Sequence, residues 1–208
     1  MKQPILSSMY NTSERRLQPM MQLYDSNRQR LYANGQERTA FLNAAQHQLP
    51  HIRIFCRTLV FTGCRISEAL ALAPSAVQPA SATITFETLK RRKRGVMREV
   101  PIPSELALER EAISLPEQSF IWQLDGVPIN RSTAYRWIKQ VMKEAGIKGA
   151  MASPKGLRHG YGIHTILCGV PLTMLQNWMG HAAISTTSIH ASTIGKEERE
   201  IAGWMWHD

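Results

Sequence analysis

The amino-acid sequence predicts a single, mostly helical α+β domain with one small antiparallel sheet. Three observations predict this class. Apolar residues recur at helical spacing from Gln36 onward, two short stretches alternate between apolar and polar residues around a basic turn, and the chain has no internal repeat. With 208 residues, 43% of them hydrophobic, the chain can bury a substantial core.

The segment before this domain, residues 1–35, is expected to be a loosely ordered arm. It mixes Ser, Asn, Gln, Pro and charged residues without a sustained period. At most a short helix is predicted within it, at residues 20–32. The arm is too short for a second domain, so residues 36–208 are assigned to one domain.

Two helices and a short third are predicted to open the domain. The first begins near Gln36, and residues 52–61 form a nearly all-apolar stretch that ends at Gly63. This second helix is expected in the core. The third spans residues 66–73 and is closed by Pro74.

A β-hairpin is predicted next. Residues 82–89 alternate between apolar and polar side chains and are rich in Thr, Ile and Phe, and residues 96–103 alternate again. The basic residues between the two stretches form the turn, so the hairpin presents positive charge at its tip.

The rest of the chain is predicted to be helical, apart from an irregular stretch at residues 116–128. One helix is expected at residues 104–113. Asn130 or Ser132 caps an amphipathic helix that Gly146 stops. Four further helices are expected at residues 156–168, 172–179, 185–191 and 196–206.

The composition excludes several classes of protein. Three cysteines, Cys56, Cys64 and Cys168, are too few and too scattered for a disulfide framework or a paired-thiol zinc site. No apolar run approaches the roughly 20 residues that a membrane span needs, and the polar start has no signal-peptide core. A cytoplasmic protein without membrane contact is therefore expected.

The charge points to nucleic acid as the partner. The chain has 25 Lys+Arg against 16 Asp+Glu, a net charge of +9 and a pI near 9.8. Two thirds of the excess lies within residues 51–100. The run there consists mainly of Lys90, Arg91, Arg92, Lys93, Arg94 and Arg98. Such a run is by itself more often a solvated loop than a binding site. Whether this one binds nucleic acid has to be judged from the motifs elsewhere in the chain.

Four separated positions carry candidate chemistry. They are Arg65 with Glu68 in TGCRISEAL, Lys90 at the hairpin, Lys155 and Arg158 in SPKGLRH, and His181 in MGH. Singly, each has a structural explanation, such as a local ion pair or a core histidine. Together they fit attack on a DNA phosphodiester, because two arginines clamp the phosphate oxygens while a Lys or His transfers a proton.

These motifs resemble the tyrosine recombinase, or phage integrase, family over roughly residues 36–195. TGCRISEALAL resembles the first box of that family, the hairpin resembles its sheet, and SPKGLRHGYGIHTILCGVPLTMLQNWMGH resembles its second box. The motifs also occur in the family's order and spacing. The resemblance implies the tyrosine recombinase fold and DNA cutting and rejoining through a 3′-phosphoprotein linkage, without a metal or nucleotide cofactor.

The resemblance also implies roles for single residues. Arg65 and Arg158 are the two arginines that clamp the scissile phosphate. Lys90, with Lys93 as the alternative, protonates the leaving 5′ oxygen. His181 takes the position of the later histidine and assists.

Two positions depart from the family's pattern. The family usually has His three residues before the second arginine, where this chain has Lys155, which still offers a cation to the phosphate. The family's tyrosine nucleophile falls nine residues after the histidine of the Gly-His pair, and that position is His190 here. Imidazole can accept a phosphoryl group, but its outer nitrogen lies roughly 2 Å closer to the backbone than a tyrosine oxygen, and a misplacement of about 1 Å can cost about 100-fold. We therefore expect impaired cleavage.

Other readings remain open at this point. The five tyrosines do not readily replace the nucleophile, because Tyr135 and Tyr161 belong to predicted helices and the others lie in the arm. The main alternative is a non-catalytic DNA-binding regulator or accessory protein on a recombinase scaffold. A basic α+β protein without a nuclease-like site is the third.

The resemblance also implies partners. Double-stranded DNA is expected to contact Arg91, Arg92, Lys93, Arg94, Arg98, Arg131 and Lys139. Family members assemble on DNA by exchanging C-terminal segments, so a homo-oligomer is expected through Ile201, Trp204 and Trp206. They usually carry a separate core-binding domain, which residues 1–35 cannot form, so we expect weak, salt-sensitive DNA binding and an accessory DNA-binding partner. A prokaryotic, phage or plasmid context is expected.

Overall fold

The computed structural model describes residues 22–88, 95–111, 120–124 and 126–191, together with residues 199, 202 and 203. Helices dominate these ranges and the sheets are small and antiparallel, which confirms the predicted α+β class. The α-helices are α1 (Gly35–Gln46), α2 (Pro50–Thr62), α3 (Ile66–Leu70), α4 (Ser104–Glu111), α5 (Arg131–Glu144), α6 (Pro154–Leu167), α7 (Leu172–Met179) and α8 (Ile184–Ser188). Two 3₁₀ turns are η1 (Pro74–Ala76) and η2 (Ile189–Ala191). Within the described ranges, no helix is long and apolar enough to cross a membrane.

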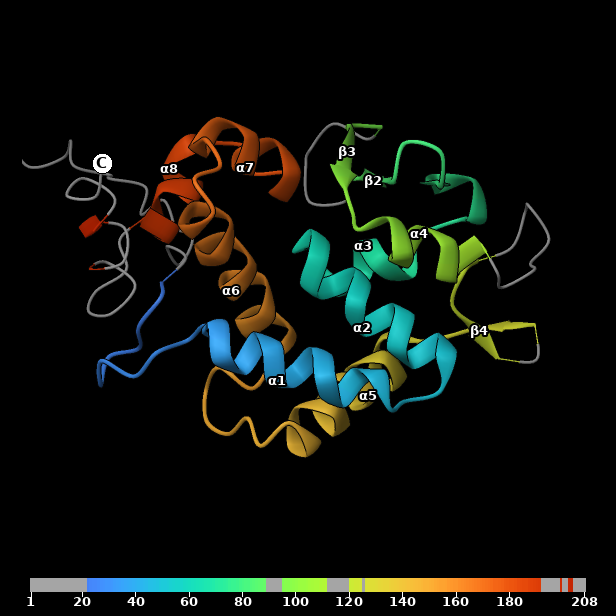
Figure 1. Ribbon diagram of the computed structural model, residues 1–208, viewed down its shortest axis with the longest axis horizontal. Coiled ribbons are helices and arrows are strands. Elements are labelled where there is room, and N and C mark those ends of the chain that lie inside the picture. The colour runs from blue at the N-terminus through green and yellow to red at the C-terminus, as the bar shows by residue number, and fades with distance from the viewer. Residues whose placement is uncertain are drawn as a thin grey trace, which may run out of the picture.

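Helix α2 lies at the centre of the core. Figure 1 shows it between α6 and α4, with α1 packed alongside it. Pro50 suits its first turn, which needs no N–H donor there, and Gly63 ends it in the left-handed conformation with φ of +58°. Its buried residues are Ile54, Phe55, Cys56, Thr58, Leu59, Val60 and Thr62. The predicted core helix at residues 52–61 is therefore confirmed.

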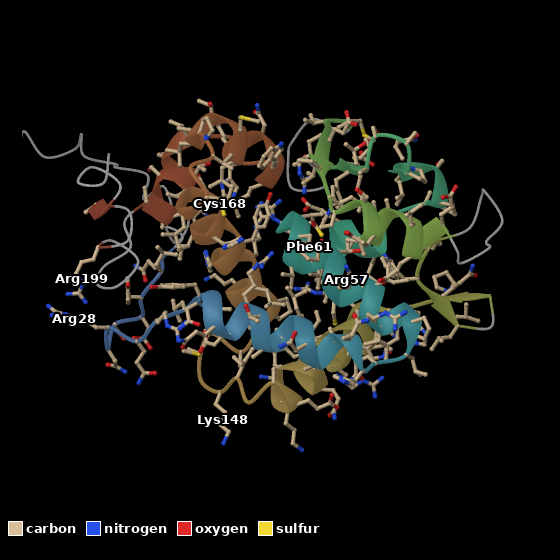
Figure 2. All side chains as sticks on the ribbon, in the orientation of Figure 1. Arg28, Arg57, Phe61, Lys148, Cys168 and Arg199 are labelled. Atoms are coloured by element: carbon tan, nitrogen blue, oxygen red, sulfur yellow. The ribbon has the colours of Figure 1, made fainter. Side chains whose placement is uncertain are left out.

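The outer side of α2 is tied to α4 by charge. Arg57 lies over the ring of Phe61 on the same helix, and both are labelled in Figure 2. The guanidinium of Arg57 also donates to the carboxylate of Glu109 on α4. Because α4 follows the hairpin directly, this ion pair adds a contact between the helix after the sheet and the core helix.

The predicted hairpin is present as strands β2 (Thr83–Glu87) and β3 (Met97–Pro101), and a short strand β1 (Val77–Gln78) extends the sheet in the order β1-β2-β3. Ile84 pairs with Val100 and Phe86 with Arg98. These four side chains are buried, while their neighbours along each strand are more exposed. Residues 89–94, where the sequence predicted the basic turn, lie outside the described residues.

Residues 22–34 form a turn that packs on α6, and the short helix predicted at residues 20–32 is wrong over its described part. Asp25 Oδ1 accepts hydrogen bonds from the backbone N–H groups of Asn27 and Gln29, which offers the backbone a turn instead of a helix. Leu23 and Tyr32 are buried in a small cluster with Ile163 of α6. This part of the expected loose arm is therefore attached to the domain.

Other element boundaries differ from prediction by a few residues. The cap of α5 is Asn130, whose side chain accepts the N–H of Thr133, so of the two predicted caps it is the one used. Helix α3 ends at Leu70 instead of residue 73. The stretch predicted as irregular contains a second small sheet, formed by β4 (Gln123–Leu124) and β5 (Val127–Pro128). Most of the predicted terminal helix at residues 196–206 lies outside the described residues.

Candidate active site

The first predicted arginine sits where the chain leaves α2 and enters α3. Arg65 is the N-cap of α3, and its backbone N–H donates to Glu68 Oε2 at 2.8 Å. A glutamate three residues after the cap commonly returns to the cap N–H in this way. The guanidinium of Arg65 donates to the other oxygen of Glu68 at 2.7 Å, and its side chain stays 26% exposed. Arg65 is therefore held in place while one side still faces solvent.

Glu68 is the buried anion of the site. Its side chain is fully buried and also accepts a hydrogen bond of 2.7 Å from Arg98 of β3. Burial by itself would raise the pKa of Glu68, but the nearby charge of Arg98, the backbone N–H of Arg65 and the charge of Arg65 together lower it. Glu68 is thus ionised and shared between two arginines.

The second predicted arginine, Arg158, joins three helices. It lies on α6, and its guanidinium donates to the backbone carbonyl of Gly63 after α2 and, at 2.7 Å, to that of Met179 at the end of α7. Burial, followed by the repulsion of Arg65, lowers the pKa of Arg158 to about 9, so it remains charged at neutral pH. These two contacts and a third one, to His181, use fewer than the five N–H donors of a guanidinium group. Donors therefore remain for a substrate.

His181 supports Arg158 from the other side. Its Nε2 lies 3.0 Å from a terminal nitrogen of Arg158, and its Nδ1 lies 2.9 Å from the hydroxyl of Thr187. Since Arg158 can only donate, Nε2 must accept, which places the ring proton on Nδ1. Burial, then the charge of Arg158, lowers the pKa of His181 to about 3. The imidazole is therefore neutral and orients the arginine.

His190, at the position expected for a nucleophile, is enclosed in the protein. It lies on η2, is fully buried, and stacks on His181 with ring centroids 6.0 Å apart. His159 of α6 packs on it at 5.5 Å. Neither ring nitrogen of His159 or His190 has a hydrogen-bond partner among the described residues. Burial, then the charge of Arg158, lowers the pKa of His190 to about 4, so this ring is also neutral.

A glycine of α6 makes room for this imidazole. A β-carbon placed on Gly162 would lie 2.6 Å from Cγ of His190, which is closer than real β-carbon contacts. The ring therefore rests directly on the helix backbone. This contact places η2 close to the helix that carries Arg158.

We expect Gly162→Ala to lower the free energy of unfolding by about 2 kcal/mol, because overpacking outweighs the gain of about 1 kcal/mol in helix propensity. The same substitution made with His190→Ala is expected to be neutral or stabilising, since the clash is then absent. Urea unfolding of the four proteins of this cycle measures both effects. An equal cost in both backgrounds would contradict the contact.

The structure brings some predicted site residues together and leaves others apart. Arg65, Arg158, His181 and His190 lie in one cluster. Lys155 is exposed in the first turn of α6, one turn before Arg158. The predictions for Lys90, Arg91, Arg92, Lys93, Arg94, Ile201, Trp204 and Trp206 concern positions outside the described residues.

The predicted DNA contacts of the described residues fall in different surroundings. Arg131 is exposed at the start of α5. Lys139 donates to the carbonyl of Ala152 at 2.7 Å and lines a groove of about 650 Å³ together with Arg136, Lys143 and Lys148. Figure 2 shows Lys148 pointing away from the body of the molecule.

Arg98 differs from its prediction as a DNA contact, because it is only 8% exposed and its nitrogens donate to protein groups. Sequence reasoning grouped it with the basic run and missed its partner Glu68. The alternation of β3 carried the signal, since Arg98 shares its inward face with Val100.

Among the residues with described positions, no group of three or more His, Cys, Asp and Glu side chains could hold a metal ion.

Comparison with known proteins shows which family this chain resembles. Residues 29–193 match the model of the phage integrase family. A tyrosine recombinase of Thermosipho africanus is 32% identical over 142 residues, which are 67% of this chain and 49% of that protein. The tyrosine recombinase XerD of Corynebacterium glutamicum is 29% identical over 154 residues, 72% of this chain and 50% of that protein. The chain spans about half the length of these two relatives.

Solved structures show the same fold. The crystal structure of XerA recombinase has a TM-score of 0.74 at 22% identity, covering 85% of this chain and 65% of that one. The pre-cleavage complex of the XerH site-specific recombinase with difH substrate has a TM-score of 0.67 at 19% identity, covering 88% and 60%. At these identities the likeness concerns the fold.

Proposed function

Since the chain belongs to the phage integrase family, we propose that its site is built to cut and rejoin DNA strands at specific sequences, and that His190 impairs the cutting step. The observation that carries this proposal is the pair Arg65 and Arg158, each held by buried protein acceptors on converging helix ends. A pair of fixed guanidinium groups matches the oxygens of a phosphodiester. Double-stranded DNA is the proposed partner.

The proposed reaction transfers a phosphoryl group without net hydrolysis. A protein nucleophile forms a bond to the scissile phosphorus while the bond to the 5′ oxygen breaks, and rejoining reverses these events. Arg65 and Arg158 stabilise the negative charge on the remaining phosphate oxygens. Lys90 is proposed to donate the proton that the 5′ oxygen needs, and Lys155 to bind the phosphate. His181 acts by holding Arg158.

The proposed impairment rests on the surroundings of His190. A nucleophile needs an accessible lone pair directed at phosphorus, within roughly 3–3.5 Å of it. The imidazole of His190 is fully buried against Gly162 and between two other histidine rings. Attack by this ring would require η2 to move. The same burial favours a second candidate function, a DNA-binding regulator that uses the phosphate site without cutting.

A suicide substrate with a nick near the scissile phosphate tests both functions. We expect the present chain and His190→Phe to form no covalent complex, whereas His190→Tyr forms a denaturant-resistant protein–DNA complex. In each case η2 must move on the DNA, and only the tyrosine then carries a hydroxyl that extends roughly 2 Å further from the backbone than the imidazole nitrogen. Denaturing gels measure the yield, and gel shifts confirm that all three proteins bind the substrate.

Each other outcome has a definite meaning. A covalent complex formed by the present chain would show that His190 attacks and would refute the impairment. If all three proteins bind the DNA and His190→Tyr still does not react, the regulator replaces the recombinase as the function of this chain.

A further inference from the structure

One buried arginine outside the predicted catalytic set connects the parts of the site. Arg98 of β3 donates to Glu68 Oε2 at 2.7 Å, to the hydroxyl of Thr88 at 3.0 Å and to the carbonyl of Trp178 at 2.8 Å. Its guanidinium also lies 5.0 Å from the ring centroid of Phe86. The side chain therefore ties the hairpin to α3 and to the end of α7.

We infer that Arg98 is a positioning residue for the proposed cleavage reaction: it neutralises Glu68, so that the charge and orientation of Arg65 remain available to the substrate phosphate. This inference rests on the proposed function. Arg98 itself is too buried to touch DNA, with 8% of its surface exposed. It acts through Glu68, which both arginines contact.

The charge balance of the triad supports this role. Arg65, Glu68 and Arg98 together carry one net positive charge, because one carboxylate faces two guanidinium groups. Without Arg98, Arg65 and Glu68 would form a neutral pair, and the attraction between Arg65 and a phosphate would be largely cancelled. Removing one partner of a buried charge leaves the other uncompensated, so Glu68 would also draw Arg65 more strongly inward.

The contacts around Arg98 explain why it holds a single position. A β-carbon on Gly180, the glycine of the MGH motif, would lie 3.1 Å from the Thr88 hydroxyl and 3.2 Å from Cδ of Arg98, so the glycine lets the hairpin approach α7 closely. The carbonyl that accepts from Arg98 belongs to Trp178, and the next carbonyl, of Met179, accepts from Arg158. Arg98 of the triad and Arg158 are thus both held by backbone carbonyls at the end of α7.

A charge-rescue experiment in the His190→Tyr background tests this inference. We expect Arg98→Met to lower the cleavage rate at saturating DNA by about 100-fold, the size of effect seen when one charge-stabilising group is lost. Adding Glu68→Gln should recover most of the rate, because a neutral amide needs no neutralising arginine. Arg98→Lys, which keeps the charge, should lie between Arg98→Met and the parent. A role limited to fold stability predicts no rescue by Glu68→Gln.

DNA binding gives a second readout that needs no cleavage. In the present chain, Arg98→Met should lower the slope of log Kd against log salt concentration by about 1, as loss of one phosphate contact does, and Glu68→Gln should restore it. Arg110→Met is the matched control, since Arg110 is 7% exposed on α4, and it should leave the slope unchanged.

The outcomes separate the two proposals. Equal loss in Arg98→Met and in Arg98→Met with Glu68→Gln would overturn the role of Arg98 while leaving the proposed function intact. If Arg65→Ala binds and cleaves DNA like its parent, the phosphate clamp itself is wrong, and the proposed function falls first.

Discussion

Replacing Arg65 by alanine in a chain that carries His190→Tyr is expected to slow strand cleavage by about 10³-fold while changing the free energy of unfolding by less than about 1 kcal/mol. The two effects separate because the side chain of Arg65 is partly exposed and Glu68 keeps Arg98 as a partner. The lost guanidinium is needed mainly when charge develops on the phosphate. Single-turnover cleavage of a nicked substrate and urea unfolding measure the two effects.

Arg158→Ala is the comparison that makes this result specific. It should reduce cleavage at least as strongly, but it should also lower the free energy of unfolding by about 2–4 kcal/mol, since the buried carbonyls of Gly63 and Met179 lose their donor. Arg158→Lys keeps the charge without the planar fork and should remain defective in cleavage. A fully active Arg65→Ala protein, or one as unstable as Arg158→Ala, would refute the assigned roles.

Acid is expected to destabilise the folded protein. Lowering the pH from 7 to 5 is expected to reduce the free energy of unfolding by about 5 kcal/mol, because three buried histidines stay neutral in the folded protein. The folded-state pKa is about 3 for His159, about 3 for His181 and about 4 for His190, against an ordinary value of 6.5. Burial is the main cause of all three shifts. The next cause is the neighbouring His190 for His159 and the charge of Arg158 for His181 and His190.

The sign follows from proton uptake. As the pH falls through 6.5, the unfolded chain binds protons at these rings, whereas the folded chain cannot do so until about pH 4 or below. Stability is therefore lost from about pH 6.5 down to about pH 4 for His190 and down to about pH 3 for His159 and His181. The slope is roughly 1.4 kcal/mol per pH unit for each ring.

Urea unfolding at half-unit steps from pH 7.5 to pH 4.5 measures this dependence. His159→Leu is the matched control, because it removes one titrating ring from a fully buried site of similar size. Its stability should fall less steeply with acid, by about the share of one ring. Identical slopes in the two proteins would show that the buried histidines are not the cause.

Local patterns explain how much was predictable from the sequence. The nearly all-apolar run at residues 52–61 and the alternating stretches around the basic turn are local patterns, so helix α2 and the hairpin were predictable from periodicity. The spacing of Arg65, Arg158 and His181 agreed with a known family pattern, and in the structure these three residues lie near one another.

Contacts between distant segments were not readable in the same way. Arg98 and Glu68 are 30 residues apart in the chain, and no local sequence pattern indicates that they pair. The burial of His190 depends on Gly162 of another helix, which no local period reveals. The helix predicted at residues 20–32 failed because the side chain of Asp25 captures backbone N–H groups that a helix would use.

The glycines of α6 have a consequence for the way this protein folds. Gly156, Gly160 and Gly162 lie within its fourteen residues, and each lowers intrinsic helix stability by about 1 kcal/mol relative to alanine. A helix of this length and composition does not persist alone in water. It forms when α2 and α7 present the carbonyls that receive Arg158 and when other segments pack against its glycines. We therefore expect the proposed phosphate site to form only together with the tertiary contacts of α6, in one cooperative step.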